Sequence, residues 1–306
     1  MMLITDHFVH VHVSKTGGTF VESMVRKLYE ARGCHVVEVI EDQPLPWRQR
    51  VQRVFSRQPA IFLLQHYPTY ISDQPAHGRT IKHAKHQTPN KHGWVYQIPP
   101  EHRHKPILTT IRNPYDRIVS QFEYKNWQQA RGSKYRESVI ASHYPHFPNL
   151  TFAEYVELMR LLADELMLPK LSPEDQIGYQ TREVLRTLFQ DPLRLLDIDA
   201  DYLAERRYRE DVAPNLHYTF THDLNHGLYQ FLRKLDFPHE EIAFILEHNK
   251  VLPRKGGRRE DQAWEKYYTP EFRRPLSGAA SVLCSRCSRS SGKKRWMRMR
   301  NRRVPL

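Results

Sequence analysis

Two short segments carry residues whose types and spacing suit the binding of phosphate-like anions. The first is SKTGGTF, residues 14–20, which lies between an alternating apolar segment and a helix-period pattern. Adjacent glycines allow main-chain N–H groups to close around an oxyanion where a helix begins. A lysine and two threonines add a point charge and hydroxyl donors. We therefore predict an anion cradle made by Lys15, Thr16, Gly17, Gly18 and Thr19.

The order of residues in this loop separates it from other lysine–glycine loops. A Walker A loop places its lysine after the glycines, whereas Lys15 precedes both glycines here. The KTG element of serine β-lactamases needs an SxxK nucleophile earlier in the chain, but SxxK occurs only at Ser290 and Ser291. A glycine turn with a surface lysine is the alternative for the segment by itself.

The second segment is RNPYDRIVSQFEY, which starts at Arg112 directly after an apolar run. The Asn-Pro pair suits the cap and first position of a helix, so Arg112 is expected at the carboxyl end of a strand. Its guanidinium suits bidentate phosphate binding, and Ser120 adds a hydroxyl in the helix. An ordinary ion pair between Arg112 and Asp116 is the alternative. Two anion-binding elements about a hundred residues apart predict a ligand with two separated phosphates.

The elements that must position these segments alternate between strands and helices. Alternation of this kind is typical of a parallel sheet covered on both faces. We therefore expect an α/β, three-layer, P-loop-like fold with a central parallel sheet, helices on both faces and a helical C-terminal half. Strands are expected at residues 8–13, 34–40, 60–64 and 106–111, and helices at 19–30, 113–127, 152–168 and 224–235.

Charge and composition divide the chain of 306 residues into two parts. Nine of its 47 Lys and Arg residues, and none of its 34 acidic ones, lie in 276–306. We expect one domain over 1–275, followed by a disordered basic tail over 276–306 that is the only segment suited to nucleic acid. A nucleic-acid-binding arm, an unrelated extension and a shifted reading frame are alternatives for the tail.

Cysteine content and hydropathy predict the compartment. Three cysteines cannot make a disulfide framework for a chain of this size, and the lone CxxC at Cys284 and Cys287 has no second ligand pair for zinc. No apolar run reaches the length of a membrane span. We expect a cytoplasmic protein that has no metal and no membrane partner.

Together the two anion-binding segments resemble the motifs of the sulfotransferases that use 3′-phosphoadenosine 5′-phosphosulfate (PAPS), and most closely the heparan-type and bacterial branch. The first motif of that branch looks like PKTGGT and the second like RNPxxRxxSxYxY. The resemblance implies that the cradle holds the 5′-phosphosulfate, and that Arg112 and Ser120 hold the 3′-phosphate. Ser14 departs from the family pattern, where proline is usual.

A third, weaker similarity lies in LPRKGGRREDQAWEKYYTPEF, residues 252–272. This stretch is similar to the late RKG loop and downstream tryptophan of cytosolic sulfotransferases. The resemblance implies a loop that closes over the 3′-phosphate and is formed by Arg254, Lys255 and Gly256. With it the likeness extends over roughly residues 7–275.

The resemblance implies transfer of a sulfuryl group from PAPS to an acceptor hydroxyl, on a carbohydrate in particular, without a metal. Lys15 would neutralise the leaving phosphate oxygen, and a neutral histidine would accept the acceptor's proton. Of the 18 histidines, His92 stands before the 106–111 strand at a distance similar to that of the catalytic histidine in the heparan 2-O branch. We rank His92 first as the base, His86 second and His66 third.

Two other classes of protein fit parts of the pattern. A P-loop-type nucleotide kinase or phosphotransferase would also cradle phosphates, but it would need Mg²⁺ and prefer ATP. A basic nucleic-acid-binding protein would explain the net charge of +13. The acceptor and the oligomeric state are not encoded in any pattern that we recognise.

Overall fold

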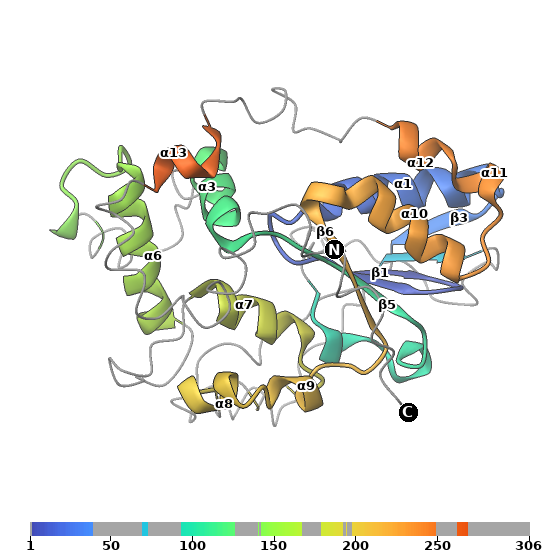
Figure 1. The fold of residues 1–306 in the computed structure, drawn as a ribbon, viewed down its shortest axis with the longest axis horizontal. Coiled ribbons are helices and arrows are strands. Elements are labelled where there is room, and N and C mark those ends of the chain that lie inside the picture. The colour runs from blue at the N-terminus through green and yellow to red at the C-terminus, as the bar shows by residue number, and fades with distance from the viewer. Residues whose placement is uncertain are drawn as a thin grey trace, which may run out of the picture.

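The computed structural model describes residues 2–38, 69–72, 93–125, 140, 142–166, 179–191, 194, 198–248 and 262–268. Figure 1 shows a sheet near one end of the molecule, with helices on two sides of it and a further helical group beside it. The strands are β1 (Met2–Thr5), β2 (Val9–Val11), β3 (His35–Glu38), β4 (Thr69–Ser72), β5 (Ile107–Ile111) and β6 (Leu216–Phe220).

These strands form one mixed sheet in the order β3-β4-β1-β2-β5-β6. The pairs β1–β4, β2–β5 and β5–β6 are parallel, and the pairs β1–β2 and β3–β4 are antiparallel. The α/β class is thereby confirmed. The antiparallel β1–β2 hairpin was not predicted; its turn is closed by Thr5, whose hydroxyl donates to the carbonyl oxygen of Phe8 at 2.8 Å.

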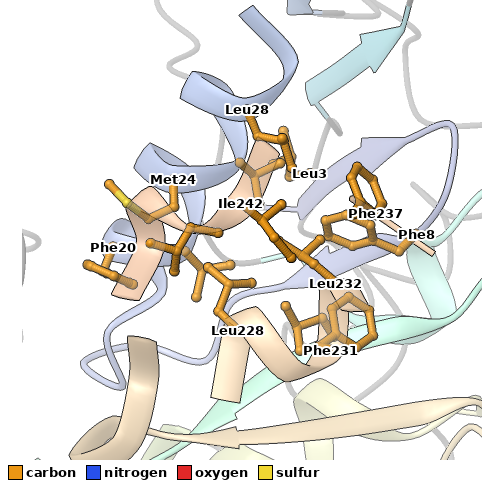
Figure 2. Close-up of a cluster of buried hydrophobic side chains, with 14 of the residues drawn as sticks. Leu3, Phe8, Phe20, Met24, Leu28, Leu228, Phe231, Leu232, Phe237 and Ile242 are labelled. Atoms are coloured by element: carbon orange, nitrogen blue, oxygen red, sulfur yellow. The ribbon is translucent and has the colours of Figure 1, made fainter. Parts of the chain in front are cut away.

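One face of the sheet is covered by α1 (Gly18–Ala31), α10 (Leu224–Lys234), α11 (His239–Ile242) and α12 (Phe244–Glu247). Leu3, Phe8 and Leu108 project from the sheet region into a cluster with apolar residues of these helices. Figure 2 shows the side chains interlocking between helix and strand. The helices form because apolar residues recur every three or four positions and are buried here.

The opposite face of the sheet packs on a different group of elements. Met2, Ile4 and Val9 contact a cluster that includes Ile98 and Leu188. The 3₁₀ helix η2 (Val95–Gln97) and the helix α7 (Tyr179–Leu188) contribute to this cluster, and α8 (Ala200–Ala204) and α9 (Tyr208–Asp211) pack against α7 in a further cluster. The short 3₁₀ helix η3 (Pro100–His102) follows η2. Helices on both faces therefore confirm the layered arrangement.

A third group of helices lies beside the sheet. It contains α3 (Pro114–Tyr124), α6 (Phe152–Leu166) and α13 (Trp264–Tyr267), while the short η6 (Thr221–Asp223) connects β6 to α10. α3 begins as its sequence predicts, because the Asn113 side chain accepts hydrogen bonds from the amides of Tyr115 and Asp116. It ends at Tyr124, three residues before the expected end at 127.

The other predicted elements show which patterns were informative. α1 ends at Ala31, close to the expected end at 30, and is followed by a left-handed glycine, Gly33, whose φ is 75°. β6 was missed because only one of its five residues, Thr219, is buried, so it lacks an apolar pattern. The strand expected at 60–64 and the tail 276–306 lie outside the described residues.

Candidate active site

The predicted cradle is the turn between β2 and α1. Its two glycines are required for different reasons. Gly17 has a φ of 100°, in the left-handed region that favours glycine. Gly18 lies against the ring of His12, and a Cβ atom there would stand 2.1 Å from that ring. The turn can therefore approach β2 closely only with glycine at residue 18.

The main-chain oxygens of four consecutive residues in this turn accept hydrogen bonds from side chains. The donors come from three separate parts of the chain. They are Thr16 Oγ1 to Val13 O at 2.8 Å, Arg117 Nε to Ser14 O at 2.7 Å, Arg112 Nη1 to Lys15 O at 3.1 Å, and Thr221 Oγ1 to Thr16 O at 2.6 Å.

This set of hydrogen bonds fixes the direction of the amides. In a planar trans peptide the C=O and the following N–H point in opposite directions. Carbonyls held by the two arginines at the start of α3 and by Thr221 of η6 therefore turn the N–H groups of residues 15–17 away from those donors. α1 starts at Gly18, and no side chain caps Gly17, so the first N–H groups of the helix have no intrahelical partner. The turn has the donors that an oxyanion requires.

Arg112 joins the second motif to the first. Its Nη1 donates to the Lys15 carbonyl, and its Nε lies 2.5 Å from Asp116 Oδ2. The ion pair considered as an alternative is thus present, and it holds the guanidinium beside the cradle. Burial lowers the pKa of Arg112 to about 10, which leaves the group charged at neutral pH. The guanidinium also carries a second terminal nitrogen, Nη2, that can face a ligand.

Lys15 lies in an unusual environment for a lysine. Its backbone is left-handed, with a φ of 61°, and its Nζ lies 2.8 Å from the centre of the Tyr124 ring. Burial and, to a lesser extent, the charge of Arg112 lower the pKa of Lys15 to about 8. A cation held over an aromatic face and next to a guanidinium suits the neutralisation of a buried anion.

The spacing of α3 gathers the other residues of the second motif. Asp116, Ser120 and Tyr124 follow Arg112 at intervals of four, which places them on one side of the helix. The contacts of Arg112 and Tyr124 with Lys15 show that this side faces the cradle. Ser120 lies on the same side of the helix, between these two residues in the sequence, and its side chain is half-buried. The structure thus brings the cradle, Arg112 and the helix side that bears Ser120 together.

The late segment docks on the same helix. The Trp264 ring stacks on Tyr115 at a centroid distance of 5.4 Å. Gln262 Nε2 donates to Glu123 Oε2 at 2.5 Å, and the Tyr267 hydroxyl donates to the other oxygen of Glu123. The part of the late segment that contains the tryptophan, residues 262–268, therefore packs against α3. Arg254, Lys255 and Gly256 lie outside the described residues.

Some predicted site residues lie where the structure gives no description, and some functional contacts were not predicted. His92, His86 and His66 are outside the described residues, so the choice of base stays a prediction. Arg117 and Thr221 were missed as determinants of the loop. Arg117 belongs to the RNPxxR pattern, which could have drawn attention to it, whereas nothing in the sequence singles out Thr221.

Within the described residues, no group of three or more His, Cys, Asp or Glu side chains could hold a metal ion. In the same part of the chain, no helix is both long enough and apolar enough to cross a membrane.

Comparison with known proteins identifies the class. The model of the sulfotransferase family matches residues 1–187, which contain the cradle and α3. The chain belongs to the sulfotransferase family. A solved structure of mouse sulfotransferase SULT7A1 complexed with PAP is similar over 97% of this chain and 89% of that chain, with 16% identity and a TM-score of 0.43. Curated protein sequences include no significant match.

Proposed function

We propose that the protein transfers the sulfuryl group of PAPS to an acceptor hydroxyl and releases adenosine 3′,5′-bisphosphate. The observation that carries this proposal is the hydrogen bond from Arg112 Nη1 to the Lys15 carbonyl. It brings together two anion-binding elements of the kind that a nucleotide with phosphates at its 5′ and 3′ ends requires. Family membership supports the sulfuryl chemistry.

The 5′ end of PAPS is assigned to the cradle. The N–H groups of Lys15, Gly17, Gly18 and Thr19, with the Thr19 hydroxyl, are the proposed donors to the phosphosulfate. The predicted donation from the Thr16 hydroxyl is not part of the proposal, because that hydroxyl donates its one proton to the carbonyl of Val13. In the reaction the acceptor oxygen bonds to sulfur while the bond between sulfur and the bridging phosphate oxygen breaks. Lys15 is proposed to neutralise the charge that gathers on this leaving oxygen. Positioning and cations therefore supply the catalysis, and the proposal includes no metal.

The 3′-phosphate is assigned to Arg112 and Ser120. Arg112 is held by Asp116 and by the loop, so little of its side-chain entropy is lost on binding. Arg254, Lys255 and Gly256 are proposed to complete this end of the site. Docking of Trp264 on α3 supports that assignment, because it anchors the segment that follows them.

The acceptor and its base form the finer part of the proposal. The acceptor hydroxyl must lose a proton as it attacks, and His92 is proposed to accept it, with His86 and His66 as the next choices. A saccharide is the proposed acceptor, on the basis of the motif likeness to the heparan-type branch. Replacement of the correct base by alanine should slow turnover by about 10²- to 10⁴-fold and leave nucleotide affinity unchanged.

The test is binding followed by transfer. Calorimetry should detect binding of adenosine 3′,5′-bisphosphate without Mg²⁺, and labelled PAPS should give a labelled product in a screen of saccharides, phenols and alcohols. Preference for ATP with Mg²⁺ would favour a nucleotide kinase instead. Salt-dependent binding of nucleic acid that persists after deletion of 276–306 would favour a nucleic-acid-binding protein.

A further inference from the structure

Arg117 is the largest side chain in the described core that is almost completely buried. It is 1% exposed, and it carries a charge at neutral pH. Burying a guanidinium is costly unless every donor finds a partner. An apolar side chain could fill the same space without that cost. The charge of Arg117 therefore calls for a role other than packing.

Two nitrogens of Arg117 donate hydrogen bonds, and the third forms an ion pair without hydrogen-bond geometry. Nε donates to the carbonyl of Ser14 at 2.7 Å. Nη1 donates to Gln180 Oε1 at 2.5 Å, and Nη2 lies 2.8 Å from Glu183 Oε2. Gln180 and Glu183 belong to α7, whereas Ser14 directly precedes the cradle. The guanidinium therefore connects α3, α7 and the anion-binding turn.

The two arginines of the second motif differ in what they can reach. The Arg112 side chain is 14% exposed and the Arg117 side chain 2% exposed. Arg112 is the more accessible of the two, whereas each nitrogen of Arg117 lies against a protein group. Arg117 can influence a bound anion only through the peptide that it holds.

We propose that Arg117 is a positioning residue that sets the direction of the Lys15 amide. The carbonyl of Ser14 and the N–H of Lys15 share one peptide plane, so the hydrogen bond to Ser14 orients that N–H toward the anion. Glu183 and Gln180 fix the guanidinium in turn, and α7 thereby supports the cradle. This inference rests on the proposed function for the identity of the anion.

Substitution of Arg117 by lysine distinguishes the effect of the charge from the effect of the guanidinium geometry. Arg117→Lys keeps a positive charge for Glu183 but loses the planar fork that reaches three partners at once. The matched control is Arg182→Lys. Arg182 is a second buried arginine, 4% exposed, which lies in α7 next to Glu183 in the sequence. If Arg117→Lys does not fold, Glu183→Gln preserves the side-chain shape and removes only the charge.

The first measurement is hydrogen exchange of the ligand-free protein. Amides in peptides covering residues 13–19 should exchange about tenfold faster in Arg117→Lys, and about threefold faster in Glu183→Gln, than in wild type. The control should match wild type in these peptides. Wild-type exchange in both test variants, or equal acceleration in the control, would overturn the inference.

The second measurement connects the loop to the ligand. Arg117→Lys should lower the affinity for adenosine 3′,5′-bisphosphate by about 10- to 100-fold, while the KM for the acceptor stays constant. Unchanged affinity in this variant would overturn the inference. If wild type does not bind this nucleotide, the proposed function fails, and the exchange data still decide whether Arg117 holds the loop.

Discussion

The guanidinium of Arg112 donates a hydrogen bond to the main-chain oxygen of Lys15, a residue 97 positions earlier in the chain, at 3.1 Å. This contact exists because β2 and β5 are parallel neighbours, with Val11 paired to Thr109. Parallel neighbours end at the same edge of a sheet, so the segments that follow them meet. The fold thereby turns two separate sequence motifs into one site.

The alkaline limit of activity should report on Lys15. Because its pKa is lowered to about 8, the ammonium is lost as the pH rises through about 8, well below the usual range of a lysine. If the ammonium neutralises the leaving oxygen, kcat/KM for PAPS should fall about tenfold per pH unit above that point. A pH profile measured with saturating acceptor tests this expectation.

The control for Lys15 is a residue that keeps its charge. Lys15→Arg should have lower activity at neutral pH, because its geometry differs, but its alkaline limit should move upward by more than one pH unit. An alkaline limit that is identical in wild type and Lys15→Arg would show that another group titrates.

Gly18 should be intolerant of alanine. The added Cβ would lie 2.1 Å from the His12 ring, so the ring or the turn must move. We expect Gly18→Ala to lose about 1–3 kcal/mol of stability through overpacking, and to bind adenosine 3′,5′-bisphosphate more weakly because the cradle amides shift. Chemical denaturation and calorimetry measure the two effects.

Gly227→Ala is the comparison for that substitution. Its Cβ would meet Thr219 at 3.1 Å, and alanine is a better helix former by about 1 kcal/mol. A small net change in stability and normal nucleotide binding are expected. Normal binding by Gly18→Ala would mean that the close approach of the turn to β2 does not matter for the ligand.

His10 should make the fold sensitive to acid. It lies in β2 with both ring nitrogens unpartnered among the described residues, and burial lowers its pKa to about 3. Below about pH 6.5 the unfolded chain takes up a proton that the folded chain does not, so stability falls as the pH falls. The loss is about 1.4 kcal/mol per pH unit, or about 2 kcal/mol between pH 6.5 and 5.

His10→Leu should remove that dependence and raise the free energy of unfolding at pH 5. Denaturation of the variant and of wild type at pH 5 and pH 7 measures the difference. His226→Leu, at an exposed position of α10, is the control for the loss of a histidine. An equal pH dependence in wild type and His10→Leu would contradict the assignment.

The sequence predicted the parts of the fold that short-range rules govern. A helix after Gly17 and Gly18 and another after Asn113 follow from turn and capping chemistry, and both are present. β6 could not be predicted because its partner β5 determines it through main-chain hydrogen bonds and its side chains are largely accessible. Tertiary pairing therefore outweighed local pattern at β6, whereas the helices expected at 152–168 and 224–235 are present as α6 and α10.

The candidate site divides in the same way. Residue types predicted donors at Lys15 and Arg112, because phosphate-like anions need those groups. The RNPxxR pattern could have drawn attention to Arg117, but not to the carbonyl that it holds, and the role of Thr221 could not be predicted at all. Each acts by holding a carbonyl that only the folded loop brings within reach. Residues that line the cradle can be predicted from their chemistry, whereas residues that hold its main chain become apparent only in the folded structure.

The most direct test compares adenosine 3′,5′-bisphosphate with adenosine 5′-monophosphate, which lacks the 3′-phosphate, in calorimetry of wild type, Arg112→Ala and Lys15→Ala. Wild type should prefer the bisphosphate by about 10- to 100-fold. Arg112→Ala should lose that preference. Lys15→Ala should bind both nucleotides more weakly and keep the preference for the bisphosphate. A preference for the bisphosphate that persists in Arg112→Ala would contradict the account.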